Sequence, residues 1–128
     1  MPDTDTHDRA YMRDRLRQEI ARGHRYRRQF AVLLFEAVPS SDGMPIRRKV
    51  EAALDAIRAT VRPSDVVGRV FEDTVLLLLV ETDRRGAQDA LLRIRYRVAR
   101  AAGNWDITLY IFPDQQEAIA GLSALAAA

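Results

Sequence analysis

Arginine supplies almost all of the positive charge in this 128-residue chain, since only one of its 20 basic residues, Lys49, is a lysine. A guanidinium group is planar and presents its N–H donors as a fork, which suits it to bind phosphate and carboxylate oxygens in pairs. The bias therefore points to surfaces that bind phosphate, although the base composition of the genome would explain it equally.

Arg62 and Asp65, separated by a proline and a serine, combine a donor of paired hydrogen bonds with an acceptor. Arginine binds phosphate, or the O6 and N7 atoms of guanine, while a carboxylate accepts hydrogen bonds from N1 and N2. The Arg62–Asp65 tetrad also suits a plain turn closed by a surface ion pair, so the pattern alone leaves both interpretations open.

Other kinds of site find little support in the composition. The chain has no cysteine, so disulfides and thiolate metal sites are excluded, and His7 and His24 are too far apart in sequence to suggest a metal site. The basic stretch at residues 22–28 is too short to indicate a nucleic-acid surface, so a nucleic-acid partner is not expected. No apolar run is long enough to cross a bilayer, and the first ten residues do not resemble a signal peptide, so we expect a cytoplasmic protein without a membrane partner.

Hydrophobic periodicity divides the chain into alternating helices and strands. Two runs rich in β-branched residues around a tight turn predict an antiparallel hairpin. Thr82 and Asp83 are placed to cap the helix that follows the hairpin, and Gly103 to end it. The predicted elements are a helix over 8–24, a strand over 30–38, a helix over 46–61, hairpin strands at 66–71 and 74–81, a helix over 84–102, a strand over 105–112 and a final helix after Pro113.

Without its first and last helices, this order is strand, helix, strand, strand, helix, strand. Such a βαββαβ chain normally folds as a ferredoxin-like sandwich with an antiparallel central sheet and flanking helices, which is an α+β fold. At this length we expect one domain, over residues 9–128, preceded by a disordered stretch at residues 1–8.

The same order resembles the GGDEF domain, a bacterial fold that makes cyclic di-GMP from two GTP molecules. The resemblance covers roughly residues 9–125 and is most specific in the segments RPSDVVGR, LLLLVETDRRGAQDALLRIR and ITLYIFP. It implies a cytoplasmic bacterial signalling domain with the nucleotide-cyclase type of ferredoxin-like sheet.

The catalytic positions implied by this resemblance have changed. Glycines belong in the signature turn because its backbone needs positive φ and closely approaches the nucleotide. A glutamate of the signature, thought to assist catalysis, is also replaced. We therefore expect a degenerate GGDEF domain that is not an enzyme. The signature falls on Phe71, Glu72, Asp73, Thr74 and Val75.

The metal-binding positions that the resemblance implies keep two carboxylates, Glu36 near the end of the first strand and Asp73 in the hairpin turn. They would lie on adjacent strands, where two carboxylates could hold a magnesium ion. Acidic residues at strand ends are more often simply solvated. We therefore expect no bound metal or cofactor, with Glu36 and Asp73 as the weak candidates.

The resemblance also implies an inhibitory site for the product, built on an Arg-x-x-Asp tetrad that ends five residues before the signature. Arg62 and Asp65 match it, and Arg93 falls on a second arginine of that site, with Arg95 nearby. We therefore expect a non-catalytic GGDEF-like signalling domain that binds cyclic di-GMP through these four residues. The alternative is a ligand-free module in which the fold serves dimerisation or the docking of a partner protein.

Overall fold

The structure is a computed structural model that describes residues 8–39 and 43–127. Most of the stretch predicted to be disordered, residues 1–7, lies outside the described residues. Asp8 differs from that prediction, because its side chain caps the first helix by accepting a hydrogen bond of 2.9 Å from the backbone N–H of Tyr11.

The chain forms four helices and four strands within the described residues, in the predicted order. A polar cap begins the third helix, because the Asp83 carboxylate accepts a 2.8 Å hydrogen bond from the N–H of Gly86. The elements are α1 (Arg9–Tyr26), β1 (Phe30–Ala37), α2 (Ile46–Arg58), β2 (Val66–Phe71), β3 (Thr74–Leu79), α3 (Arg84–Ala102), β4 (Trp105–Phe112) and α4 (Gln116–Ala127).

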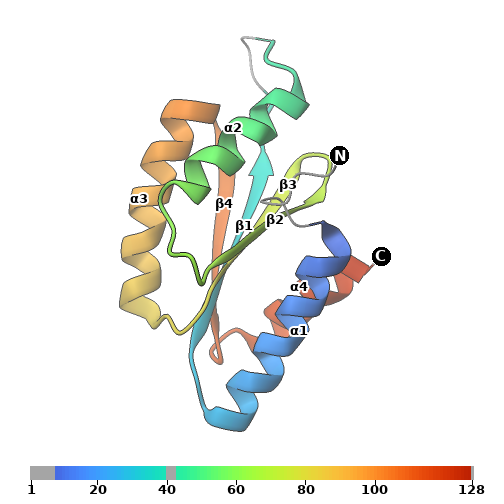
Figure 1. The fold of residues 1–128 in the computed structure, drawn as a ribbon, viewed down its shortest axis with the longest axis vertical. Helices are drawn as coiled ribbons and strands as arrows, with labels where there is room; N and C mark the ends of the chain where they lie inside the picture. The colour runs from blue at the N-terminus through green and yellow to red at the C-terminus, as the bar shows by residue number, and fades with distance from the viewer. Residues whose placement is uncertain (1–7, 40–42, 128) are drawn as a thin grey trace.

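The four strands form one antiparallel sheet in the order β2-β3-β1-β4 (Figure 1). Strand β1 lies inside the sheet, where Leu33 pairs with Leu77 of β3 and with Leu109 of β4. Strands β2 and β3 form the predicted hairpin, with a register shift between Arg69 and Phe71. The α+β prediction with a ferredoxin-like antiparallel sheet is confirmed.

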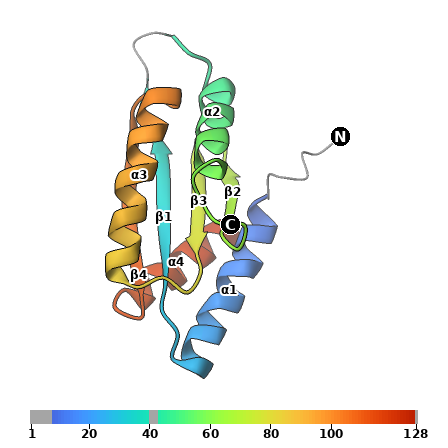
Figure 2. The ribbon, with the colours of Figure 1, turned by 60° about the vertical axis from the view of Figure 1, so that its left-hand side comes forward.

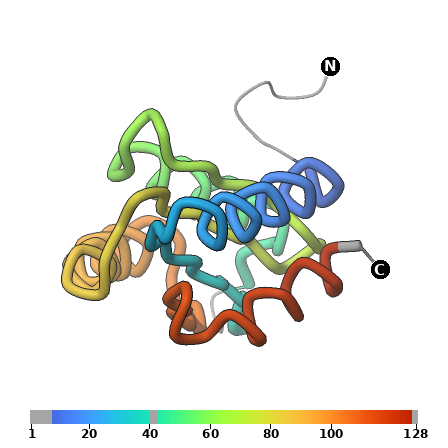
Figure 3. The backbone as a smooth tube through the Cα atoms, turned by 90° about the horizontal axis from the view of Figure 1, so that it is seen from below, coloured from blue at the N-terminus to red at the C-terminus, as the bar shows by residue number. Residues whose placement is uncertain are grey.

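Side chains of β1 alternate between two hydrophobic cores, one on each face of the sheet. Ala31, Leu33 and Phe35 enter the core beneath α2 and α3. Phe30 and Val32 enter the core that α1 and α4 cover on the opposite face. A strand buried on both faces needs a continuous apolar run, which accounts for the sequence FAVLLF. Figures 2 and 3 show the two helix pairs, α2 beside α3 and α1 beside α4.

The helices found in the described part of the chain include none that is both long and apolar enough to cross a membrane. All six arginines of α3 are exposed, and Arg93, one of the predicted site residues, is among them. The candidate site is therefore sought on the face of the sheet that α2 and α3 cover.

Helix α1 packs closely against the end of β4. Phe112 stacks on Phe30, with ring centroids 4.7 Å apart, and the His24 ring meets Phe112 edge-on at 5.2 Å. Gly23 lies directly over the Phe112 ring, so that a Cβ at this position would overlap it. The glycine is therefore needed for close approach between helix and sheet.

We expect Gly23→Ala to destabilise the fold by about 1–3 kcal/mol, because the buried Phe112 ring has no room to move aside. Gly121→Ala is the matched control, since nothing lies within 4 Å of a Cβ built on this exposed helical glycine. That change should be neutral or stabilise the fold by about 0.5–1 kcal/mol. Urea unfolding of the two variants measures both effects, and equal stabilities would contradict the packing argument.

Candidate ligand-binding site

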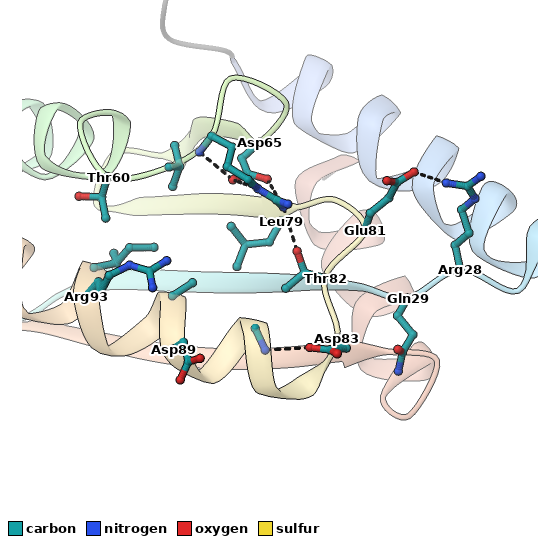
Figure 4. Close-up of a pocket in the computed structure, with 15 residues that line it drawn as sticks. Arg28, Gln29, Thr60, Asp65, Leu79, Glu81, Thr82, Asp83, Asp89 and Arg93 are labelled. Carbon is teal, nitrogen blue, oxygen red and sulfur yellow. Dashed lines mark hydrogen bonds and ion pairs between the residues drawn. The ribbon is translucent and has the colours of Figure 1, made fainter.

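A cavity of about 640 Å³ opens between the loop that joins α2 to β2 and the first half of α3. The loop contributes Arg62 and Asp65, α3 contributes Arg93, and the exit of β3 contributes Thr82. Figure 4 shows the Asp65 side of the cavity facing the helix that carries Arg93. Residues far apart in sequence therefore meet in one place, including three of the four predicted site residues.

Arg62 is held in place by a dense set of hydrogen bonds. Its Nε and Nη2 atoms donate to the two Asp65 carboxylate oxygens, at 3.3 and 3.0 Å. Nη2 also donates to the Val80 carbonyl at 2.6 Å and to the Thr82 hydroxyl at 3.0 Å. The Nη1 nitrogen carries no hydrogen bond within the described residues, and the side chain is 54 % exposed. One edge of the guanidinium is thus fixed while the other remains open to a ligand.

Asp65 is almost completely buried, with a side-chain exposure of 2 %. Besides the guanidinium, its carboxylate accepts from the backbone N–H groups of Arg62 at 3.0 Å and Val80 at 3.3 Å. The hydrogen bond to Asp65 is the main cause that raises the pKa of Arg62, against an opposing effect of burial. The predicted role of Asp65 as an acceptor for a guanine edge is therefore not supported by this geometry. Asp65 orients Arg62 instead.

The two predicted arginines of α3 lie in different surroundings. Arg93 lines the cavity, is exposed, and makes no ion pair or hydrogen bond with any described residue. Arg95 does not line the cavity, because two positions along a helix turn a side chain to another face. The structure therefore brings Arg93 together with Arg62 and Asp65 and leaves Arg95 apart.

Several residues of the cavity were missed by the sequence analysis. Arg28 lines it from the start of β1 and forms an ion pair with Glu81, which has a left-handed backbone with φ of 46°. Asp89 lines it from α3 and makes no ion pair or hydrogen bond with a described residue. The spacing of Asp89 and Arg93, one turn of the same helix, was a usable signal. The left-handed backbone of Glu81 had no such signal in the sequence.

The cavity contains carboxylates as well as arginines, so it is not simply a basic patch. Three of its four carboxylates are already engaged: Asp65 with Arg62, Glu81 with Arg28, and Asp83 with the N-terminus of α3. The charged groups of the cavity without a partner among the described residues are the open edge of Arg62, Arg93 and the Asp89 carboxylate. A ligand that matches them has acidic groups together with hydrogen-bond donors.

The candidate metal residues lie at the other end of the sheet. Glu36 pairs with Thr74, and the N–H of Ala37 donates to the carbonyl of Asp73 at 3.0 Å, so Glu36 and Asp73 are on neighbouring backbone segments. Both are exposed. The described residues contain no group of three or more potential metal ligands.

Comparison with known proteins identifies the scaffold. No family model matches the sequence, and no curated protein resembles it significantly. A DGC protein from Thermotoga maritima superimposes with a TM-score of 0.78 at 20 % identity, covering 94 % of this chain and 95 % of that one. The chain has the fold of a GGDEF domain.

Two further structures share this GGDEF fold. Diguanylate cyclase SiaD from Pseudomonas aeruginosa, solved with its activator SiaC, gives a TM-score of 0.72 at 19 % identity and covers 98 % of this chain but 57 % of its own. The GGDEF domain of DgcB from Caulobacter crescentus, solved with c-di-GMP, gives a TM-score of 0.68 at 11 % identity over 99 % of this chain and 89 % of its own.

The expectation that the chain is not an enzyme is wrong, because the solved proteins that share its fold include diguanylate cyclases. That expectation rested on the side chains of the hairpin turn. No described residue of this turn has positive φ, so the turn forms without the glycines that the argument required. Glu36 and Asp73 also remain on adjacent segments. Changed turn residues do not by themselves exclude catalysis.

We expect the effects of Arg62→Ala and Asp65→Ala on unfolding free energy to be strongly non-additive, because each residue is the other's main partner. The double variant should lose less stability than the two single losses added together, by on the order of 1 kcal/mol. Arg62→Ala alone leaves a buried carboxylate without its cation. Urea unfolding of the four proteins measures this coupling, and simple additivity would show that the pair does not act as a unit.

Proposed function

We propose that this protein is a signalling domain that binds cyclic di-GMP in the cavity between the α2–β2 loop and α3. One observation carries the proposal: Arg62 is fixed along one edge by the buried Asp65 and faces a cavity that also holds the unpaired Arg93. Two guanidinium groups with free donors are the natural partners of phosphodiester oxygens.

The remaining free group suits the base of the same ligand. Asp89 is a carboxylate at the cavity without a partner among the described residues. Guanine presents two donors, N1 and N2, that such a carboxylate accepts. Within the proposal Asp89 thus takes the role first expected of Asp65, while Asp65 holds Arg62 in position. A fixed guanidinium loses less conformational entropy on binding than a mobile one.

Two other considerations support this function. The GGDEF domain of DgcB, which shares the fold, was solved in complex with c-di-GMP. The proposal places the protein in the bacterial cytoplasm, where it would meet such a ligand. The lack of cysteine agrees with this reducing compartment.

A ligand-free interaction module is the second candidate, and one observation favours it. The side chains of Arg62 and Asp65 take part in six hydrogen bonds, three within the loop and three that tie the loop to the segment after β3. Such a pair also serves a purely structural purpose. In this case the fold would act through a homodimer or a partner protein, as SiaD does with its activator SiaC.

Isothermal titration calorimetry with cyclic di-GMP tests the first proposal. We expect the wild-type protein to bind, and Arg62→Ala or Arg93→Ala to weaken binding by about tenfold to a hundredfold, the loss of a charge-assisted contact of about 1.5–3 kcal/mol. Arg95→Ala is the matched control on the same helix and should bind like the wild type, since Arg95 lies outside the cavity.

Circular dichroism should first establish that each variant is folded. If the folded wild-type protein gives neither heat nor chemical-shift changes at high micromolar ligand, the binding proposal fails and the interaction module becomes the better account. Equal losses for Arg93→Ala and Arg95→Ala would instead show a non-specific charge effect.

We further expect Glu81→Gln to tighten cyclic di-GMP binding severalfold. The change removes a negative charge from the cavity and releases Arg28 from its ion pair, so that a third guanidinium becomes available to the ligand. The gain should shrink as salt is raised, because the Glu81 and Arg28 side chains are both more than half exposed. Titrations of both proteins with cyclic di-GMP at low and high salt measure this gain. If Glu81→Gln and the wild type bind with the same affinity at low salt, Arg28 lies outside the site.

A further inference from the structure

A second concavity, which we call the α2–α3 groove, lies on the outer surface of the helix pair. Helices α2 and α3 run side by side over one face of the sheet (Figure 2). The groove has a volume of about 590 Å³. Its floor is formed by alanines of both helices, and its rim by long side chains of α3. The lining residues are Ala56, Ala59, Arg93, Tyr96, Arg97, Arg100 and Ala101.

The rim of the groove is positively charged and contains no acid. Three arginines line it, and none of the seven lining residues is a carboxylate. Arg93 and Arg97 make no ion pair or hydrogen bond with any described residue. Arg100 donates a 2.9 Å hydrogen bond to the Tyr96 hydroxyl, and its guanidinium lies 5.6 Å from the centroid of the same ring. The charge of this rim is therefore left without compensation from the groove itself.

The groove also continues into an apolar stripe along α3. Tyr96 is 61 % exposed and Leu92, one helical turn before it, is 65 % exposed. They are two of the five large hydrophobic residues that are exposed in the described part of the chain. A partner that fits has apolar side chains to cover the alanine floor and this stripe, and acidic side chains to meet the arginines. Phosphate backbones offer the charge but not the apolar surface.

We propose that the α2–α3 groove docks an acidic amphipathic helix of a partner protein. The helix would lay its apolar face on Ala56, Ala59 and Tyr96, and its flanking carboxylates would reach Arg97 and Arg100. This is recognition of a helix in a groove, in which apolar contacts supply affinity and charge complementarity sets orientation and partner choice.

The groove and the ligand cavity share one residue, Arg93, which lines both. Arg93 has one side chain to offer, and turning its guanidinium toward a phosphate in the cavity takes it away from a carboxylate in the groove. Docking of the acidic helix and binding of cyclic di-GMP therefore oppose each other, which gives the domain a ligand-controlled output. This coupling rests on the proposed function, whereas the docking itself does not.

A designed peptide serves as the probe. It contains glutamate, leucine and alanine over about 18 residues, five helical turns, arranged as an amphipathic helix, and it carries a fluorescent label. A scrambled peptide of the same composition is the control for charge alone. Fluorescence anisotropy with the full chain should show binding of the amphipathic peptide and binding of the scrambled peptide that is at least about tenfold weaker.

Three exposed arginines of α3 then separate the effects. Arg97→Glu should weaken peptide binding about tenfold or more and leave cyclic di-GMP binding unchanged, because Arg97 lines only the groove. Arg95→Glu, the same charge change on another face of the helix, should leave both intact. Arg93→Ala should weaken both. Arg62→Ala should weaken only cyclic di-GMP, so failure of the ligand site and failure of the groove are distinguishable.

Four results would overturn docking: no peptide binding, equal affinity for the scrambled peptide, equal losses for Arg97→Glu and Arg95→Glu, or tighter binding of a single-stranded oligonucleotide of matched charge. The last would identify a nucleic-acid surface instead. If the peptide and cyclic di-GMP both bind and saturating cyclic di-GMP leaves peptide affinity unchanged, the coupling through Arg93 is wrong while the docking stands.

Discussion

The burial of strand β1 on both faces is the constraint from which the rest of the structure follows. Its apolar side chains enter two separate cores, and its backbone is hydrogen-bonded to β3 on one edge and β4 on the other. Each face of the sheet must then be covered by a helix pair, because a strand that is apolar on both sides cannot leave either to water. The division of the helices between two layers results from this requirement.

One of these layers carries the candidate site, and the reason lies in the loops that connect its elements. The loop after α2 and the exit of β3 meet where Arg62 reaches Asp65, Val80 and Thr82 at once. The buried carboxylate of Asp65 stabilises this arrangement, because it accepts hydrogen bonds from the loop backbone and from the backbone at the end of β3. Helix α3 then closes the cavity with Arg93. The hydrophobic core on that face therefore fixes the walls of the cavity, although the side chains that would meet a ligand are polar.

The sequence allowed the elements and the fold to be predicted because both depend on local periodicity. The strand predicted at residues 105–112 has these bounds in the structure, and the hairpin turn is where the two β-branched runs placed it. The role of Asp65 could not be predicted from local periodicity, because its carboxylate is buried against Val80 at the end of β3, fifteen residues away in sequence. Arg28, whose partner Glu81 lies 53 residues along the chain, shows the same limit. The conclusion about catalysis was wrong because it treated the side chains of one turn as decisive.

The left-handed backbone of Glu81 means that the stability of the fold and the charge of the candidate cavity are set at the same position. An L-residue in this conformation costs roughly 1–2 kcal/mol, a cost that glycine does not incur. Selection for a robust fold alone would favour glycine there, and the carboxylate that neutralises Arg28 would vanish with the strain. The population of folded protein and its attraction for anions would then rise together. A glutamate at this position limits both quantities, so selection for thermostability at this one residue would also change the charge of the candidate cavity.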